Sequence, residues 1–404
     1  MTGSSSTLPP TLVWLDPEQL PLVRTIVERI NLPVAAAGSP TRGRSREVAE
    51  ALAEGQGSEV EPVDDLRAAL ASWQSGAVWI AAAGTFDGQS AGGGGGSAAD
   101  IEALRACRAR GVRIATMEPI PASALELAGA GPTDDPGAPE LVRFIPRTRL
   151  SRAVLEAAEV LDAFGAVRTV AFEGWSGRGE GSLGARLLDA MDVVLWLLGE
   201  PETIDAAYMW PGKGVRERGA SVGAGAQGHA DGAAAAGAVS GGGGSGGGGG
   251  AVHLLPAETL RGLHGDMTLN CRFADGRGAA VVISDQAGRW NRSLMLVGPG
   301  GRIRVYDDGF EWVAPDGARV DASRALGASR ASDAVGSAAG GAAPGRSAAV
   351  IAEALERYLG GREGTVPPLD SGRVLAMAGA ALLSARTGEG ESPATIARMA
   401  SLAG

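Results

Sequence analysis

The stretch DIEALRACRARGVRIATMEP (residues 100–119) joins a helical pattern to a strand-like run. Leu104 and Cys107 lie three residues apart and would share one face of a helix. The short run VRIAT (112–116) follows, and we interpret it as a strand that is buried on both faces. The stretch therefore predicts a helix at 99–110 followed by a strand of a parallel sheet.

The same alternation runs through the sequence that precedes this stretch. Three further strand-like runs are TLVWL (11–15), LPVAAA (32–37) and AVWIAAA (77–83). Helical segments are expected between them at 17–30 and 43–54. Strands that alternate with helices are typical of βαβ units, so we expect an amino-terminal Rossmann-like domain with a doubly wound parallel sheet.

The order of elements changes in the second part of the chain. Strand-like runs separated by Asp-Gly and Gly-Gly turn pairs follow one another there: DMTLNCRF (266–273), AAVVISD (279–285), SLMLVG (293–298) and RIRVYD (302–307). This pattern predicts an open, mostly antiparallel sheet. We therefore expect an α/β protein with a Rossmann-like domain at 1–123 and an α+β domain at 124–404.

Glycine is unusually frequent, with 64 residues in a chain of 404. Much of it lies in two segments near 212–251 and 323–346, the first of which contains GGGGSGGGGG. Such composition cannot bury enough apolar surface to offset the entropy of ordering, so we expect both segments to be disordered loops of the second domain.

Charge and composition exclude several classes of partner. The formal net charge of −10 argues against nucleic acid and against an anionic membrane surface. No apolar run reaches the roughly 18 residues that a membrane span needs, and the start MTGSSSTLPP lacks the pattern of a secretion signal, so we expect a cytoplasmic protein. Neither Cys107 and Cys271 nor the three histidines have the spacing of a metal site, and we expect no metal.

Four segments, taken in order, resemble the glucose–fructose oxidoreductase/inositol dehydrogenase (Gfo/Idh/MocA) family. They are the opening stretch, DAMDVVLWLLGEP (189–201), MLVGPGGRIRV (295–305) and ALLSARTGEGESPATIARM (381–399). The resemblance implies a Rossmann domain that binds NAD(P) and a second domain whose sheet faces a sugar or polyol substrate. It also implies three functional motifs: a glycine-rich phosphate loop, an E-K-P segment and a D-x-G-x-H-x-x-D helix.

The phosphate loop should follow the first strand, but the sequence there is LDPEQLPLVR, without glycine. Asp16, Pro17 and Glu18 instead have the pattern of a helix N-cap, an N1 proline and a first-turn acid. A capping carboxylate would satisfy the amides that a phosphate needs, and both acids would repel its charge. We therefore expect no standard dinucleotide site, and no cofactor unless the family activity persists with NAD(P).

If a dinucleotide does bind, the resemblance implies which positions line its cleft: Asp16, Gly38, Ser39, Gly84 and Glu118. Arg42 and Arg44 follow the second strand and could receive the 2′-phosphate of NADP, although a solvated basic loop is the alternative interpretation.

The other two motifs concern proton transfer. The family lysine corresponds to Glu118, which reverses its charge and its hydrogen-bonding character. The catalytic histidine corresponds to Asp189, while Asp192 keeps the identity of the last aspartate. Glu118, Asp189 and Asp192 are thus the candidate catalytic residues. The histidines at 229, 253 and 264 offer no obvious replacement for the one that is lost.

These departures predict a protein that has lost standard hydride transfer and acts as a ligand-binding, regulatory or assembly component. It would bind a sugar or polyol and form a homo- or hetero-oligomer through its open sheet. The alternative is an NAD(P)-dependent oxidoreductase of a sugar or polyol with a rewired site. A third interpretation is acid–base chemistry without a cofactor, carried out by the candidate carboxylates.

Overall fold

The structure is a computed structural model that describes nine parts of the chain. These are residues 8–74, 76–82, 86, 98–129, 141–145, 148–209, 259–324, 345–361 and 369–403. The first glycine-rich segment (212–251), most of the second (323–346) and Gly84 lie outside the described residues.

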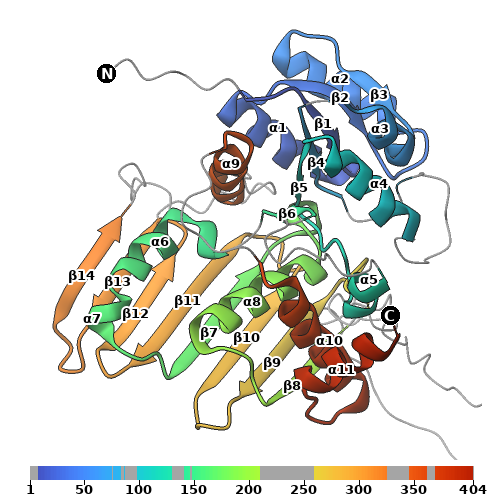
Figure 1. The fold of residues 1–404 in the computed structure, drawn as a ribbon. Coiled ribbons are helices and arrows are strands. Elements are labelled where there is room, and N and C mark those ends of the chain that lie inside the picture. Colours follow the sequence, from blue (N-terminus) through green and yellow to red (C-terminus); the bar gives the residue numbers. More distant parts are fainter. Residues whose placement is uncertain are drawn as a thin grey trace, which may run out of the picture.

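The first layer of the molecule is a six-stranded sheet in which every neighbouring pair is parallel (Figure 1). Its strands are β1 (Thr11–Trp14), β2 (Val34–Gly38), β3 (Glu61–Val63), β4 (Ala77–Ile80), β5 (Arg113–Thr116) and β6 (Arg143–Phe144). The spatial order β3-β2-β1-β4-β5-β6 reverses at β1, as in a doubly wound fold. The predicted Rossmann-like sheet is confirmed.

Helices cover both faces of this sheet. Those described are the 3-10 helix η1 (Pro17–Gln19), α1 (Leu20–Ile30), α2 (Ser45–Gln56), α3 (Leu66–Ser72), α4 (Ala98–Ala109) and α9 (Gly345–Leu359). One buried cluster joins the sheet to α1, α2 and α9, and another joins it to α3 and α4. Both faces are thus apolar, which explains why its central strands are continuous apolar runs.

Two elements from beyond residue 123 belong to this first layer. Strand β6 pairs with β5, and α9 packs against α1 (Figure 1). Ile351, Leu355 and Leu359 of α9 are buried in the same cluster as α1, because they form one apolar stripe at helical spacing. The division at residue 123 therefore stays a prediction, and the chain after it returns twice to the first sheet.

The second layer is an eight-stranded sheet in which only β7 and β10 are parallel. Its strands are β7 (Thr169–Trp175), β8 (Thr203–Met209), β9 (Asp266–Arg272), β10 (Gly278–Ser284), β11 (Asn291–Gly298), β12 (Gly301–Tyr306), β13 (Gly309–Val313) and β14 (Arg319–Arg324). The spatial order is β14-β13-β12-β11-β7-β10-β9-β8. The predicted mostly antiparallel sheet is confirmed, and with it the α/β fold class.

Helices lie on one face of this sheet (Figure 1). The elements beside it are α5 (Ala124–Gly129), η2 (Thr148–Leu150), α6 (Arg152–Glu159), α7 (Leu161–Phe164), η3 (Arg178–Glu180), α8 (Leu183–Leu198), α10 (Ser371–Thr387) and α11 (Pro393–Ala403). Helices α6, α8 and α10 pack directly on its strands. Alternate residues of β9 are buried and exposed, as expected for a sheet with one open face.

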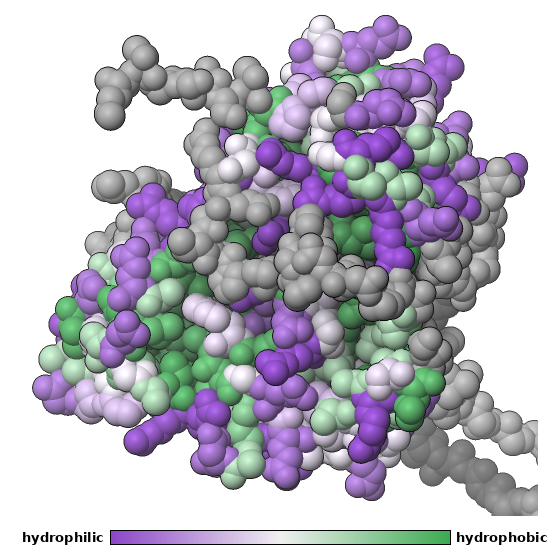
Figure 2. Space-filling view, viewed as in Figure 1, coloured by the Kyte–Doolittle hydropathy of each residue, from purple (hydrophilic) through white to green (hydrophobic). Residues whose placement is uncertain are grey.

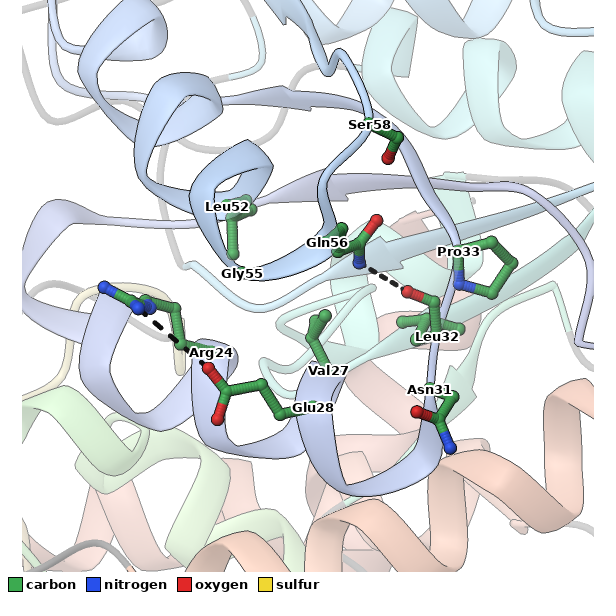
Figure 3. Close-up of a pocket in the computed structure, with 10 residues that line it drawn as sticks. All are labelled: Arg24, Val27, Glu28, Asn31, Leu32, Pro33, Leu52, Gly55, Gln56 and Ser58. Atoms are coloured by element: carbon green, nitrogen blue, oxygen red, sulfur yellow. Dashed lines mark hydrogen bonds and ion pairs between the residues drawn. The ribbon is translucent and has the colours of Figure 1, made fainter.

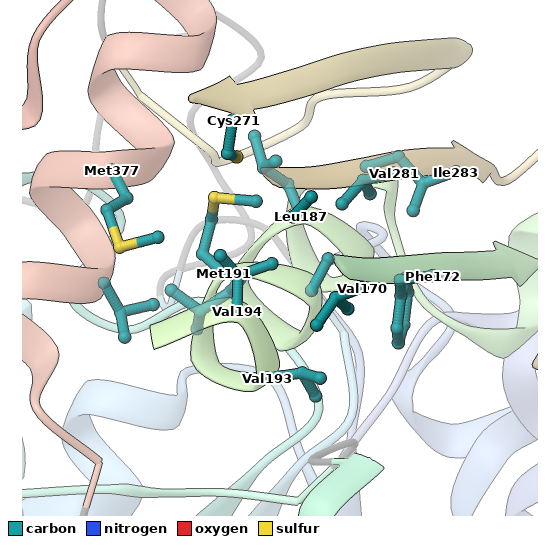
Figure 4. Packing of buried hydrophobic residues seen from close by; sticks show 14 of the residues in the cluster. Val170, Phe172, Leu187, Met191, Val193, Val194, Cys271, Val281, Ile283 and Met377 are labelled. Carbon is teal, nitrogen blue, oxygen red and sulfur yellow. The ribbon is translucent and has the colours of Figure 1, made fainter. Parts of the chain in front are cut away.

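Helix α8 is the central packing element of this layer. Figure 4 shows Leu187, Met191 and Val194 of α8 beside Val170 and Val281 of the sheet. Every residue from Leu183 to Val194 is buried, so the helix is enclosed on all sides. Its charged residues are consequently buried too, and each one needs a partner.

Exposed apolar side chains gather on the second sheet. Figure 2 shows more hydrophobic side chains over this sheet than over the helices of the first layer. Trp175, Met209, Val282, Val297 and Tyr306 are exposed residues of its strands. Assembly through this sheet stays a prediction. Among the described residues, no helix has the length and apolar character needed to cross a membrane.

The packing of α9 gives a prediction for stability. Leu355→Ala should lower the free energy of unfolding by about 2–5 kcal/mol, because its fully buried side chain leaves a cavity between α9 and the sheet. Urea unfolding followed by circular dichroism measures the loss. Leu402→Ala is the matched control, because that leucine is 82% exposed; equal losses in the two variants would contradict the packing role of α9.

Candidate functional site

The carboxyl ends of β1, β2, β4 and β5 meet at one edge of the first sheet, because these strands are parallel. Asp16 follows β1, Ser39 follows β2 and Glu118 follows β5, while Gly38 is the last residue of β2. The structure thus brings these four predicted cleft positions to the edge where doubly wound folds bind ligands. What they bind stays a prediction.

The turn between β1 and α1 is held by its own side chains. Asp16 stands at the N-cap position of η1, as predicted, and its carboxylate accepts a hydrogen bond from the Thr41 hydroxyl at 3.1 Å. The Gln19 side chain accepts from the Asp16 N–H at 3.0 Å and donates to the Ala81 carbonyl at 2.8 Å. Burial raises the pKa of Asp16, against the opposing effect of Thr41. The turn is therefore tied to the end of β4.

A second segment lies against this turn. Helix η3, which follows β7 of the second sheet, contacts η1. A Cβ atom at Gly179 of η3 would stand 2.7 Å from the Glu18 carbonyl oxygen. In Rossmann folds the pyrophosphate lies over this turn, where glycines let it approach the amides. The acidic, glycine-free turn under η3 does not fit a pyrophosphate in that position, and we assign no residue to NAD(P).

The remaining cofactor candidates have local partners. A Cβ atom at Gly38 would lie 2.6 Å from the Trp14 ring, so this glycine makes room for packing. Ser39 is buried, and its hydroxyl accepts from the Thr41 N–H at 3.1 Å. Arg44 stands at the N-cap of α2 and pairs with Glu47 of that helix, and both Arg44 and Arg42 are exposed. The binding of a 2′-phosphate by these arginines stays a prediction.

Glu118 is bound to the amino end of α8. Its carboxylate accepts hydrogen bonds from the N–H of Ser182, at 2.9 Å, and from the Ser182 hydroxyl. Ser182 is also the N-cap of α8, where its Oγ accepts from the Ala185 N–H at 3.1 Å. Burial raises the pKa of Glu118 to about 7, although the bonds from Ser182 and the charge of Arg186 oppose the shift. This carboxyl group therefore titrates near neutrality.

A histidine and a second carboxylate meet the same helix end. The Nδ1 atom of His264, just before β9, lies 2.6 Å from Oδ2 of Asp285, just after β10. Asp285 also accepts from the Leu183 N–H of α8 at 3.3 Å. The β9–β10 hairpin places His264 near the start of α8. The expectation that the histidines offer no obvious replacement stays a prediction. His229 and His253 lie outside the described residues.

Asp189 and Asp192 lie farther along α8 and face η2. Asp189 accepts from both the N–H and the hydroxyl of Thr148, the latter at 2.6 Å. Burial raises the pKa of Asp189 to about 6, opposed by the charge of Arg292 and the bonds from Thr148. Asp192 forms a buried ion pair with Arg149 at 2.7 Å. Both aspartates thus hold η2 on α8.

Arg186 connects the two groups of charges on α8. Its guanidinium donates to the Ser176 hydroxyl at 2.9 Å and lies 4.5 Å from the centre of the Trp290 ring. Burial lowers the pKa of Arg186, while Glu180, Asp189 and Glu118 raise it. The arginine therefore compensates acids on both sides of it.

Two described tryptophans of the second sheet region are held by hydrogen bonds of their indole nitrogens. The Trp290 Nε1 donates to Asp307 at 2.6 Å, and the Trp312 Nε1 donates to the Gly300 carbonyl at 2.8 Å. Trp175 is partly exposed at the end of β7, and position 210 lies outside the described residues.

A pocket of about 340 Å³ lies at the opposite edge of the first sheet (Figure 3). It is lined by the ends of α1 and α2 and by Leu32 and Pro33, which precede β2. Gln56 closes one side through a bond of 2.6 Å from its Nε2 to the Leu32 carbonyl. This pocket is separate from the charged group at α8. Among the described side chains, no cluster of histidine, cysteine and acidic residues could hold a metal ion.

Comparisons with known proteins show similarity in structure and not in sequence. No family model and no curated protein sequence matches the chain. A putative myo-inositol dehydrogenase from Sinorhizobium meliloti is 14% identical, with a TM-score of 0.53, over 95% of this chain and 99% of the other. A levoglucosan dehydrogenase in complex with NADH and levoglucosan is 15% identical, with a TM-score of 0.57. The match covers 95% of this chain and 98% of the other. The chain has the Gfo/Idh/MocA fold.

A third structure agrees with this assignment. An oxidoreductase from Agrobacterium radiobacter, in complex with NAD+, L-tartaric acid and magnesium, is 14% identical over 96% of this chain and 100% of its own, with a TM-score of 0.57. The predicted resemblance is confirmed at the level of the fold. Within the Gfo/Idh/MocA fold, the charged residues at the amino end of α8 lie where the two sheets meet, between β5 and β10.

The pKa of Glu118 predicts how stability depends on pH. The folded state holds the proton up to about pH 7, whereas an unfolded glutamate releases it near 4.5, so stability falls as the pH rises between these values. The free energy of unfolding falls by on the order of 3 kcal/mol over this range. Glu118→Gln, which keeps a neutral side chain, should flatten this dependence in urea unfolding curves.

Asp189 makes the free energy of unfolding fall with pH in the same way between pH 3.8 and about pH 6. Wild type and Glu118→Gln are therefore best compared between about pH 6 and about pH 7.5. Glu54→Gln is the control, because Glu54 is exposed on α2. A Glu118→Gln protein with the pH dependence of the wild type would show that Glu118 is ionised across this range.

Proposed function

We propose that this protein is an oxidoreductase of a sugar or polyol, with the ligand bound where β5, β10 and the amino end of α8 meet. The observation that carries the proposal is the group formed by Glu118, Asp285 and the partly exposed His264 at the amino end of α8, on the carboxyl edge of β5. The structures of similar fold include dehydrogenases in complex with NADH and levoglucosan and with NADH and L-sorbose. They support the class of ligand and of reaction.

The side chains of this region suit a polyhydroxylated ligand. Charged and polar groups that converge from several elements can accept and donate hydrogen bonds to hydroxyl groups. Glu118, His264 and Asp285 provide such groups within one region, and the side chain of His264 is 32% exposed. Because Glu118 and Asp285 are buried and bonded within the protein, the exposed part of His264 is where a sugar or polyol would make contact.

We propose NAD(P) as the redox partner on the strength of the similar structures, four of which contain NAD+, NAD or NADH. The turn between β1 and α1 limits how the dinucleotide can bind. Because η3 contacts η1, a pyrophosphate bound over this turn would compete with η3 for the same space. We derive no step of hydride transfer from the present contacts.

The second candidate is a ligand-binding or regulatory protein that carries out no hydride transfer. The contact between η3 and η1, together with Asp16 and Glu18 in a turn without glycine, favours this candidate. It keeps the sugar or polyol as ligand and differs from the first only in the dinucleotide. Measuring dinucleotide binding therefore separates the two.

Isothermal titration with NAD+, NADH, NADP+ and NADPH makes this measurement, followed by nicotinamide absorbance with myo-inositol, levoglucosan and L-sorbose as substrates. The oxidoreductase proposal expects binding of at least one dinucleotide and turnover of a sugar or polyol. Binding of a sugar without any dinucleotide supports the second candidate. Well-folded protein that binds neither ligand contradicts both.

A variant of η3 sharpens this test. The added methyl group of Gly179→Ala would stand 2.7 Å from the Glu18 carbonyl and weaken the contact between η3 and η1. If η3 competes with the dinucleotide, a loss of about 1 kcal/mol in this contact tightens dinucleotide binding about five-fold. Gly177→Ala is the matched control, because its methyl group would lie 3.9 Å from Gly288. If Gly179→Ala bound the dinucleotide with unchanged affinity, η3 would not compete with it.

A further inference from the structure

The imidazole of His264 is held on one side and open on the other. Its Nδ1 lies 2.6 Å from Oδ2 of Asp285, which is completely buried. The His264 side chain is nevertheless 32% exposed. One ring nitrogen therefore has a fixed protein partner while part of the ring remains accessible to a ligand.

The surroundings of Asp285 decide which nitrogen carries the hydrogen. Burial alone would raise the pKa of Asp285, but hydrogen bonds from His264, Gln286 and the Gly265 N–H bring it below its usual value. The last two bonds measure 2.6 Å and 2.8 Å. An ionised carboxylate can only accept, so Nδ1 of His264 must donate to it. The neutral ring then has its lone pair on Nε2, which is the nitrogen able to take a proton.

The backbone around His264 is fixed by three elements. The Tyr208 hydroxyl of β8 donates to the His264 carbonyl at 2.6 Å, and the Leu183 N–H of α8 donates to the Leu263 carbonyl at 3.0 Å. The next residue, Gly265, donates its N–H to Asp285. Side chains whose backbone and hydrogen-bond partner are both fixed are suited to catalysis, because little reorganisation is needed during the reaction.

The charged groups that face His264 come from three different elements. Asp285 follows β10, Glu118 follows β5 and Asp16 follows β1. The proximity of His264 contributes to lowering the pKa of both Glu118 and Asp16. The charge of Arg186, on α8, also lowers the pKa of Glu118. The imidazole therefore stands among acids at the junction of the two sheets, inside the region proposed for the ligand.

We propose that Nε2 of His264 is the base that takes a proton from a hydroxyl group of the bound sugar or polyol, with Asp285 as its positioning residue. The O–H bond breaks, the proton binds Nε2 and the electron pair stays on the oxygen. Asp285 stabilises the imidazolium that forms, and the reverse transfer restores the hydroxyl. The class of ligand rests on the proposed function, whereas the assignment of the base rests on the contacts of His264 alone.

The candidates on α8 are less suited to this step. Both carboxylate oxygens of Asp189 accept hydrogen bonds from Thr148, and Asp192 is paired with Arg149. All these groups are buried. Removing a proton from a ligand requires an accessible lone pair within hydrogen-bond distance, and the exposed ring of His264 meets that need.

The first test requires no substrate. The chain has three histidines, so nitrogen–proton correlation spectra of the full chain contain three sets of imidazole signals, and His264→Asn identifies one of them. We expect His264 to be the tautomer with hydrogen on Nδ1 and a free lone pair on Nε2. The opposite tautomer in the wild type would overturn the proposal.

The second test measures the reactivity of Nε2. Diethyl pyrocarbonate should modify His264 of the intact chain at neutral pH, which mass spectrometry of the digested protein detects. Asp285→Asn should slow this modification at least about three-fold while His253 serves as the internal control. Equal rates in wild type and Asp285→Asn would show that Asp285 does not activate His264. If Asp285→Asn fails to fold, Gln286→Ala is used instead. It removes one donor from the same carboxylate, so Asp285 binds the Nδ1 hydrogen more strongly and the modification of His264 should become faster; an unchanged rate would overturn the role of Asp285.

Turnover provides a third readout if a substrate of the panel reacts. His264→Asn should lower kcat by about 10²–10⁴ with a much smaller change in KM, as expected for the loss of a general base. An unchanged kcat would overturn the proposal. If no compound of the panel binds or reacts, the proposed ligand class fails, while the tautomer and the modification rate still decide whether His264 is an activated base.

Discussion

The N–H groups at the amino end of α8 need hydrogen-bond acceptors from the protein itself, because this end of the helix is buried between the two sheets. The first amides of a helix have no partner within the helix, and burying them unpaired is costly. Here Glu118 accepts from Ser182, and Asp285 and the Leu263 carbonyl accept from Leu183. One acceptor follows β5 of the first sheet and the other two come from the second. The helix start is thus the point at which the two layers are joined by hydrogen bonds.

The need for acceptors also places carboxyl groups at the amino end of α8, close to His264. A carboxylate that satisfies a helix start is buried, and burial shifts its titration toward neutrality unless other donors compensate. Glu118 has few donors, and its pKa rises to about 7, whereas Asp285 has several, and its pKa falls. The two carboxyl groups therefore titrate in different pH ranges although they meet the same helix. Such a difference between neighbouring acids is what proton transfer requires.

Much of the fold could be predicted from the sequence, since the signals are local. The central strands of the first sheet are continuous apolar runs, and α8 is a long apolar helix between a serine N-cap and a glycine. The position of α9 could not be predicted, because its apolar stripe fits either sheet equally well. The role of Asp189 and Asp192 was also hidden: their partners, Thr148 and Arg149, are about forty residues away, and nothing local indicates the pairing.

The pair formed by His264 and Asp285 could be predicted in part from the sequence. The two residues are far apart in sequence, but the register of the hairpin places Asp266 opposite Ser284. The residues just before β9 therefore lie beside those just after β10, and the two strand-like runs with their intervening turn contained this information. What the sequence did not reveal is that this end of the hairpin faces α8. That arrangement depends on packing between layers, which has no short-range signal.

The return of α9 to the first sheet has a consequence for how the protein is made. The face of this sheet that carries α1 and α2 is completed by Ile351, Leu355 and Leu359, which leave the ribosome after more than three quarters of the chain. Until then its apolar surface is exposed, and the nascent chain has a partly open layer during most of its synthesis. The contacts between α9 and α1 join residues more than three hundred positions apart, so they form late and slowly.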